Sequence, residues 1–281
     1  MKQTNLELKA QANNYPSLKL SDRHLCDIEL IMNGSFDPLD GFMSKNDYMS
    51  VVNDMRLADG TLWPMPITLD VNDKFVSEIS NSPKIALRDK EGFVLGILEI
   101  DDIWQPNLEL EAYSVFGTND LKHPGVLYLL KTSKKNYIGG KIKKIALPHH
   151  YDYHKYRHTP DELKTVFENK KWNKVIAFQT RNPLHRAHFE LTTRAMKELN
   201  ANLLVHPVVG MTKPGDVNHH TRTRCYKHIM EEYPKNSAFL SLLPLAMRMG
   251  GPRETLLHAI IRKNYGCTHL IVGRDHAGPG L

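Results

Sequence analysis

Residues 174–199 read KVIAFQTRNPLHRAHFELTTRAMKEL and place an apolar run before a polar turn and a stretch with helical spacing. The run 174–179 has the length and composition of a buried β-strand, and apolar residues recur with a helical period from about 184 to 199. This order is typical of a strand–helix unit in a parallel sheet. The polar turn 179–188 therefore lies where such sheets bind ligands, just beyond the carboxyl end of a strand.

The same alternation continues to the end of the chain. Strands are expected at 203–206, 239–243 and 268–272, and helices at 219–233 and 253–264. Alternating elements of these lengths predict right-handed βαβ units around a parallel sheet, so residues 166–281 are expected to form a nucleotide-type α/β domain. The chain stops at Leu281 after a loop that should lead into another helix, and a sheet cut there would leave an edge uncovered. We therefore expect this domain to be incomplete at its C-terminal end.

Residues 1–165 read as short strand-like pieces broken by turns. Strands are expected at 63–71, 84–88 and 93–100. Turns are expected at three dipeptides, namely Asp59-Gly60, Asn72-Asp73 and Gly139-Gly140. The N-terminal half is therefore expected to be rich in β-structure.

Composition excludes several classes of protein. The 281 residues are 41% hydrophobic and 24% charged, which is typical of globular proteins, and no apolar run approaches the ~18 residues of a membrane helix. The N-terminus has neither the apolar core of a signal peptide nor the composition of a transit peptide, so a cytoplasmic protein is expected. The three scattered cysteines exclude a disulfide framework and a cysteine-based zinc site; they are Cys26, Cys225 and Cys267. A net charge of +6 suits an anionic ligand.

The turn 179–188 is the strongest candidate for chemistry. His185 and His188 are three residues apart, so both imidazoles are expected on one face of the first helical turn, directed at the same anion. An H-x-x-H pair alone could be a surface pair or half of a metal site. The neighbouring Arg181, Asn182 and Pro183 favour an anion-binding function, and no acidic residue or third histidine at helical spacing supports a metal.

A second candidate, 273–280, follows the last predicted strand and should meet the first at the same sheet edge. Its glycines let exposed N–H groups approach an anion, and Arg274 adds a planar fork for phosphate or sulfate oxygens. Between them, 206–216 contains Lys213 and could be either a mobile wall over a nucleotide or an ordinary connection. It lacks the order of a P-loop. Arg248 and Arg253 could face this site or be ion-paired elsewhere.

A group of lysines surrounds residues 136–140, namely Lys131, Lys134, Lys135, Lys141, Lys143 and Lys144. A basic patch beside Tyr137 could bind RNA. A solvated hairpin is the more common outcome, and it is the interpretation we favour.

With these residues in view, the chain resembles the ATP sulfurylase (sulfate adenylyltransferase) family, of the form shared by fungal and many bacterial enzymes. The resemblance spans most of the chain and rests on the segments 34–43, 179–188, 206–216, 249–254, 260–266 and 273–280. Two positions depart from the family pattern: Asp37 replaces the usual Ser, and Asn218 replaces the usual Asp.

The resemblance implies an α/β architecture in which a PUA-like β-rich domain, 1–165, precedes a Rossmann-like HxxH nucleotidyltransferase domain with a parallel sheet, 166–281. It implies the reaction of ATP with sulfate to give adenosine 5′-phosphosulfate and pyrophosphate, by in-line attack of sulfate on the α-phosphate. Mg²⁺ would be carried with ATP and not held by protein ligands. A homo-oligomer is expected, whereas a membrane or a nucleic acid is not an expected partner.

The resemblance also assigns roles by position. Catalytic roles fall on Thr180, Arg181, Asn182, His185 and His188; sulfate contacts on Gln179, Arg181 and the backbone N–H of Ala277; and nucleotide contacts on Gln179, Arg181, Asn182, His185, Gly273, Arg274, Asp275 and His276. His185 and His188 resemble the pair that stabilises charge on the α- and β-phosphates in the transition state.

Two other functions remain open at this point. Another adenylyltransferase of the same fold would use the same histidine pair, but it would not need Arg181 together with Ala277 for sulfate. A non-catalytic module that binds RNA or another anion is supported only by the lysine group and the expected truncation.

Overall fold

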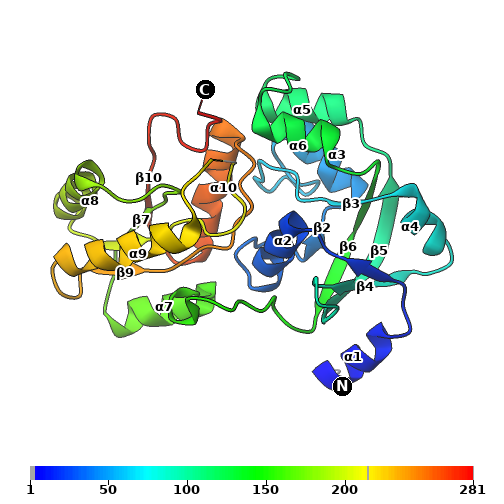
Figure 1. Ribbon diagram of the computed structural model, residues 1–281, viewed down its shortest axis with the longest axis horizontal. Helices are drawn as coiled ribbons and strands as arrows, with labels where there is room; N and C mark the ends of the chain where they lie inside the picture. Colours follow the sequence, from blue (N-terminus) through cyan, green and yellow to red (C-terminus); the bar gives the residue numbers. More distant parts are fainter. Residues whose placement is uncertain (1–3, 214, 281) are drawn as a thin grey trace.

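The computed structural model describes residues 4–213 and 215–280 and contains two sheets with helices around each (Figure 1). The N-terminal sheet comprises β1 (Ser17–Lys19), β2 (Gly41–Phe42), β3 (Leu69–Val71), β4 (Lys84–Arg88), β5 (Val94–Trp104) and β6 (Asn136–Lys144). Its order is β1-β4-β5-β6-β2, and β3 also pairs with β6. Only β1 and β4 run parallel; the remaining pairs are antiparallel. The predicted strands at 84–88 and 93–100 are confirmed, while 63–71 contributes only β3.

The dipeptide Gly139-Gly140 does not form the predicted turn. The prediction of a solvated hairpin carrying the surrounding lysines is therefore wrong. Both glycines lie inside the continuous strand β6, where Gly140 is opposite both Ile100 and Phe42. A side chain at Gly140 would collide with the carbonyl of Glu99. Glycine is needed here because two neighbouring strands approach closely, which is the other common reason for glycine within a strand.

The N-terminal half also contains helices that the sequence analysis did not identify. They are α1 (Asn5–Ala12), α2 (Asp22–Met32), α3 (Lys45–Asp54), α4 (Asp73–Glu78), α5 (Leu108–Phe116) and α6 (Pro124–Lys131). Most begin at a Ser, Thr or Asn whose side chain accepts a hydrogen bond from the first turn, as Ser21 does for α2. Asn72-Asp73, predicted as a turn, instead starts α4, with Asn72 as its cap.

The C-terminal half confirms the predicted alternation of strands and helices. Its elements are the 3₁₀ turn η1 (His154–Tyr156), α7 (Pro160–Asn169), β7 (Val175–Phe178), α8 (Arg186–Leu199), β8 (Asn202–Val205), α9 (His219–Ile229), the 3₁₀ turn η2 (Met230–Glu232), β9 (Ala238–Leu240), α10 (Gly251–Asn264) and β10 (His269–Ile271). The sheet order is β10-β7-β8-β9, and all neighbours are parallel. Predicted bounds differ from these by a few residues, and α7 was not predicted.

The order β10-β7-β8-β9 creates a switch point between β7 and β10. From β7 the chain moves one way to β8 and β9, and it then crosses back over the sheet to β10. Right-handed crossovers in opposite directions put α8 and α9 on one face and α10 on the other. Figure 1 shows α10 between the parallel sheet and the N-terminal half. The loops after β7 and β10 therefore lie at the position where open α/β sheets bind ligands.

The two halves are joined by a polar network around the start of α10. Arg248 donates from Nη2 to Asp27 Oδ2 at 2.7 Å, and both side chains are buried. Arg253 donates from Nη1 to the Val51 carbonyl and from Nη2 to the Val52 carbonyl, each at 3.0 Å. Both arginines therefore hold the two halves together. The sequence had left open whether they face the ligand site or are paired elsewhere, and the structure shows the second.

No helix among the residues that the structure describes has the length and apolar character needed to cross a membrane.

Buried and half-buried neutral histidines predict that the protein loses stability in mild acid. Burial is the main cause that lowers the pKa of six of them from 6.5, with His276 at about 4; the six are His123, His158, His188, His206, His258 and His276. Below pH 6.5 the unfolded chain therefore binds more protons than the folded chain, so the free energy of unfolding falls as the pH falls. Burial also raises the pKa of Glu111 from 4.5 to about 7, which acts in the opposite direction between these values and offsets part of the effect.

We expect the free energy of unfolding to fall on the order of 1–2 kcal/mol per pH unit between about pH 6.5 and 5. Urea unfolding at a series of pH values measures this slope. A free energy of unfolding that stayed constant or rose as the pH fell would show that these histidines are not held neutral.

Candidate functional site

Three loops from the carboxyl ends of neighbouring strands meet at the switch point. They are 179–185 after β7, the described residues 206–213 and 215–218 after β8, and 272–280 after β10. Lys213 Nζ donates to the carbonyl of Pro279 at 3.1 Å. A Cβ added to Gly280 would lie 3.8 Å from Arg181 Nη2, so the first and third loops also approach each other. The predicted meeting of the two motifs at one sheet edge is therefore confirmed.

The turn after β7 is shaped by its own polar groups. Thr180 Oγ1 donates to the carbonyl of Asn182 at 2.9 Å and accepts from the Asn182 N–H at 3.0 Å. Tyr226, on α9, donates its hydroxyl to the same carbonyl at 2.8 Å. The Asn182 side chain is left exposed, and Gln179 Oε1 is buried with no partner among residues 4–213 and 215–280. A buried acceptor without a donor is uncommon, so a ligand or water that donates to Gln179 is favoured here.

Arg181 is fixed by a carboxylate that the sequence analysis did not assign. Its Nη1 donates to both oxygens of Asp216, at 3.0 and 3.1 Å. The exposed fractions of the Arg181 and Asp216 side chains are 17% and 7%. The pair uses one guanidinium nitrogen, and Nη2 is the nitrogen that lies toward Gly280. The loop 206–216 is thus more than a connection, because its last residue orients the main cation of the turn.

The two histidines of the H-x-x-H pair lie side by side, although not both within the helix as predicted. His185 is the N-cap of α8, in extended backbone conformation, and His188 lies in the first turn. Their ring centroids are 3.9 Å apart. Burial, and then the nearby His185, lower the pKa of His188. His188 Nδ1 is buried without a partner within the described residues, whereas His185 is exposed.

The loop after β10 places a buried stretch of backbone beside the loops after β7 and β8. Gly273, Arg274 and Asp275 are exposed, whereas Ala277 is buried. Ala277 adopts the left-handed region at φ 56°, and its carbonyl accepts from the Gly251 N–H at 3.0 Å. No acceptor for the Ala277 N–H is found in 4–213 and 215–280. Left-handed backbone with an unused N–H is a common way to present a donor to an anion.

A buried relay that the sequence analysis missed supports His276 in the same loop. His258 Nδ1 and His276 Nε2 form a hydrogen bond at 3.0 Å, and Glu254 Oε1 lies 3.5 Å from His258 Nε2. The Glu254 carboxylate also accepts from the backbone N–H groups of Arg248 and Gly250. Burial, followed by His258 and Arg262, lowers the pKa of His276 to about 4, so its imidazole is neutral at pH 7. The four-residue spacing of Glu254 and His258 on one helix face was the available sequence signal.

Part of the lysine group on the N-terminal sheet is paired with acids. Lys84 and Lys143 both contact Glu99 Oε1, at 2.6 and 2.9 Å, and Lys141 lies 2.8 Å from Asp40. Lys144 donates to the carbonyl of Met32. These pairs offset part of the positive charge, which weakens the support for RNA binding.

Comparison with protein families divides the chain at the same place as the two sheets. A PUA-like domain matches residues 1–147, and an ATP-sulfurylase domain matches residues 154–281.

Comparison with curated proteins gives matches over nearly the whole chain. It is 54% identical over 280 residues to a sulfate adenylyltransferase of Saccharomyces cerevisiae, covering 100% of this chain and 55% of that protein. It is 56% identical over 277 residues to a sulfate adenylyltransferase of Phaeosphaeria nodorum, covering 98% and 48%. The chain thus spans about half the length of the curated relatives it matches.

A solved structure of a hexameric APS kinase from Thiobacillus denitrificans has the same arrangement of elements. The TM-score is 0.80 at 33% sequence identity, and the match covers 96% of this chain and 50% of that one. The expected fold, a PUA-like domain followed by a parallel-sheet nucleotide-binding domain, is confirmed.

Proposed function

The chain belongs to the ATP-sulfurylase family, and from this premise we propose that it binds ATP and sulfate and forms adenosine 5′-phosphosulfate and pyrophosphate. The contact of the three loops at Arg181 carries the proposal, because it joins a fixed guanidinium, two adjacent imidazoles and an unused backbone N–H at one edge of the sheet. Such a set of donors without a carboxylate nucleophile suits two oxyanions that are brought together.

In this proposal sulfate is held by Arg181, Gln179 and the Ala277 N–H. Asp216 already occupies Nη1 of Arg181, so Nη2 and Nε are the nitrogens that would bind the anion. A planar guanidinium binds two oxygens of a tetrahedral anion and leaves a third free for attack on phosphorus. Because sulfate is a weak nucleophile, the rate depends on its alignment with the α-phosphate more than on any proton transfer.

The histidine pair would meet the charge that develops on the leaving pyrophosphate. His185 and His188 are adjacent and exposed or half-buried, and neutral imidazole still donates one hydrogen bond. The turn 179–188 contains no carboxylate, the ligand that Mg²⁺ prefers, so we propose that the nucleotide phosphates hold the ion. Bound there, Mg²⁺ would neutralise part of the phosphate charge.

The nucleotide would lie along the loop after β10, against Gly273, Arg274, Asp275 and His276. A Cβ at Gly278 would collide with the Asp275 carboxylate, so the glycine allows the tight turn that presents this backbone. Thr180 and Asn182 would act by fixing the turn and, through the exposed amide of Asn182, by contacting the nucleotide.

The ion pair between Arg181 and Asp216 predicts a specific defect in sulfate binding. Asp216→Asn keeps the shape of the side chain but loses the charge that fixes the guanidinium, so the KM for sulfate should rise about tenfold with a small change in kcat. Steady-state kinetics at saturating ATP measure both constants. Asp161→Asn, at a carboxylate that is 92% exposed on α7, is the matched control. A lower KM for sulfate would mean that Asp216 competes with sulfate instead of orienting Arg181.

The relay through His258 predicts a defect in nucleotide binding. His258→Leu removes the hydrogen bond to His276, and the KM for ATP should rise about tenfold, the value of one hydrogen bond, while kcat changes less. His258→Asn, whose amide can replace Nδ1, should restore much of the affinity. Equal KM values in the two variants would assign His258 to packing alone.

A direct test of the proposed function is sulfate-dependent release of pyrophosphate from ATP. Release that requires sulfate supports it, whereas release without sulfate would indicate another adenylyltransferase of the same fold. Salt-sensitive RNA binding without turnover of ATP would indicate the non-catalytic alternative, which the paired lysines disfavour.

Three wider features are also proposed. The hexameric neighbour supports a homo-oligomer, and a cytoplasmic location is kept as a proposal. The domain boundary expected at 165/166 stays a prediction; α7 (Pro160–Asn169) spans that position, and the two matched families leave 148–153 between them.

A further inference from the structure

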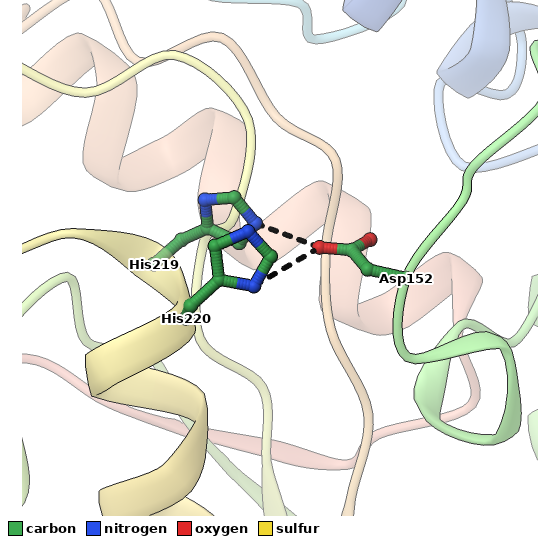
Figure 2. A group of neighbouring side chains, drawn as sticks. All are labelled: Asp152, His219 and His220. Atoms are coloured by element: carbon green, nitrogen blue, oxygen red, sulfur yellow. Dashed lines mark hydrogen bonds and ion pairs between the residues drawn. The ribbon is translucent and has the colours of Figure 1, made fainter.

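A cluster of one carboxylate and two imidazoles lies where the segment between the two family matches touches α9. Figure 2 shows His219 and His220, at the start of α9, directed at Asp152 on the segment that leads from β6 to α7. His219 Nε2 is 2.7 Å from Asp152 Oδ2, and His220 Nδ1 is 3.6 Å from the same oxygen. The three candidate ligand atoms lie within 4.8 Å of one another. We infer that Asp152, His219 and His220 form a binding site for a divalent transition metal of the zinc type.

The donor set fits this class of ion. Two imidazoles and one carboxylate are characteristic ligands of Zn²⁺, Co²⁺ and Ni²⁺, with bonds of about 2.0–2.2 Å. Ligand atoms around such an ion are about 3–3.5 Å apart, so a small rotation of the side chains closes the site around a metal. Mg²⁺ and Ca²⁺ are excluded from the proposal because they prefer sets of oxygen ligands.

Arg157 fixes the orientation of the carboxylate. Its Nη2 contacts Asp152 Oδ1 at 2.6 Å, which leaves Oδ2 facing the two imidazoles.

Neighbouring contacts fix the backbone that carries Asp152 and His220. Arg157 Nε also donates to the Asp152 carbonyl at 3.1 Å, and Tyr153 donates its hydroxyl to the His220 carbonyl at 3.4 Å. Groups that orient ligands in this way are a regular part of metal sites. The Asn218 side chain caps the helix by accepting from the His220 N–H at 2.9 Å, which fixes the backbone that carries both histidines.

The expected affinity is moderate. Arg157 and the positive end of α9 both repel a cation, and the described part of the chain supplies three ligands. The exposed fraction of the His220 side chain is 53%, so water can complete the coordination. A bound metal would tie the segment between the domains to the start of α9, three residues beyond Asp216. This inference does not depend on the proposed catalytic activity.

The test is a titration of the tag-free, metal-free chain with Co²⁺, followed by its visible absorption bands, and competition by Zn²⁺. We expect one ion per chain, weakened at least about tenfold in His219→Ala and in His220→Ala. His228→Ala is the matched control, because His228 lies on the same helix and is 83% exposed away from the cluster. Zn²⁺ should also raise the melting temperature of the unaltered chain and of the control, and it should raise that of the two variants less.

The absence of Co²⁺ binding at about 0.1 mM, or an unchanged affinity in either histidine variant that retains the native circular dichroism, would overturn the inference. Because His220 is more than half exposed, its replacement leaves the core intact and keeps the test decisive if His219→Ala does not fold.

Discussion

Arg181→Ala is expected to lower kcat/KM for sulfate by roughly 10³-fold, about 4 kcal/mol, while the KM for ATP changes less. The guanidinium is the cation that Asp216 fixes at the point where the three loops meet. Without it, sulfate loses a fork of two charge-assisted hydrogen bonds and its alignment with the α-phosphate. Sulfate-dependent pyrophosphate release at varied sulfate measures the change.

Two further variants separate charge from geometry. Arg181→Lys keeps the positive charge but lacks the planar fork, so it should recover only part of the loss. Arg186→Ala removes an arginine that is 93% exposed at the start of α8, and it should leave the kinetics unchanged. Equal activity of Arg181→Ala and Arg186→Ala would exclude Arg181 from the sulfate site.

His188→Ala is expected to lower kcat by roughly 10²-fold, the usual effect of losing one preorganised donor in the transition state. His188 is half-buried beside His185, and its Nδ1 has no partner within the described chain. The effect should fall on kcat more than on KM, because the charge on the leaving pyrophosphate develops only as the bond breaks.

The comparison for this variant is His228→Ala, at an exposed histidine remote from the turn. An unchanged kcat in His188→Ala would contradict the role of the pair. Because the pKa of His188 is already lowered by burial, the variant should also lose part of the acid sensitivity of folding, which urea unfolding can detect.

The parallel sheet could be predicted because its signal is local. The run Val175–Phe178, the turn and the helix Arg186–Leu199 follow one another in sequence, and each obeys its own period. The meeting of the loops after β7 and β10 could also be predicted, since neighbouring parallel strands end at the same edge of the sheet. The H-x-x-H spacing predicted that both histidines lie within the helix, whereas His185 is the N-cap that precedes it. Spacing alone does not distinguish these two positions.

The remainder depends on contacts between distant parts of the chain. Asp216 is 35 residues from Arg181, and no local sequence pattern around either residue predicts the ion pair. Arg248 and Asp27 are 221 residues apart, and Gly139-Gly140 looked like a turn because the strands that crowd it come from elsewhere in the sequence. Such pairings are set by tertiary packing, which overrides local preference.

The most direct test of the central claim is a calorimetric titration of adenosine 5′-phosphosulfate into the chain and into Arg181→Ala. A sulfate group held by Arg181 beside a nucleotide on the loop 272–280 predicts one saturable site per chain, with binding weakened roughly 10³-fold or lost in the variant and unchanged in Arg186→Ala. Equal affinity of the chain and the Arg181 variant, or no binding by either, would contradict the claim.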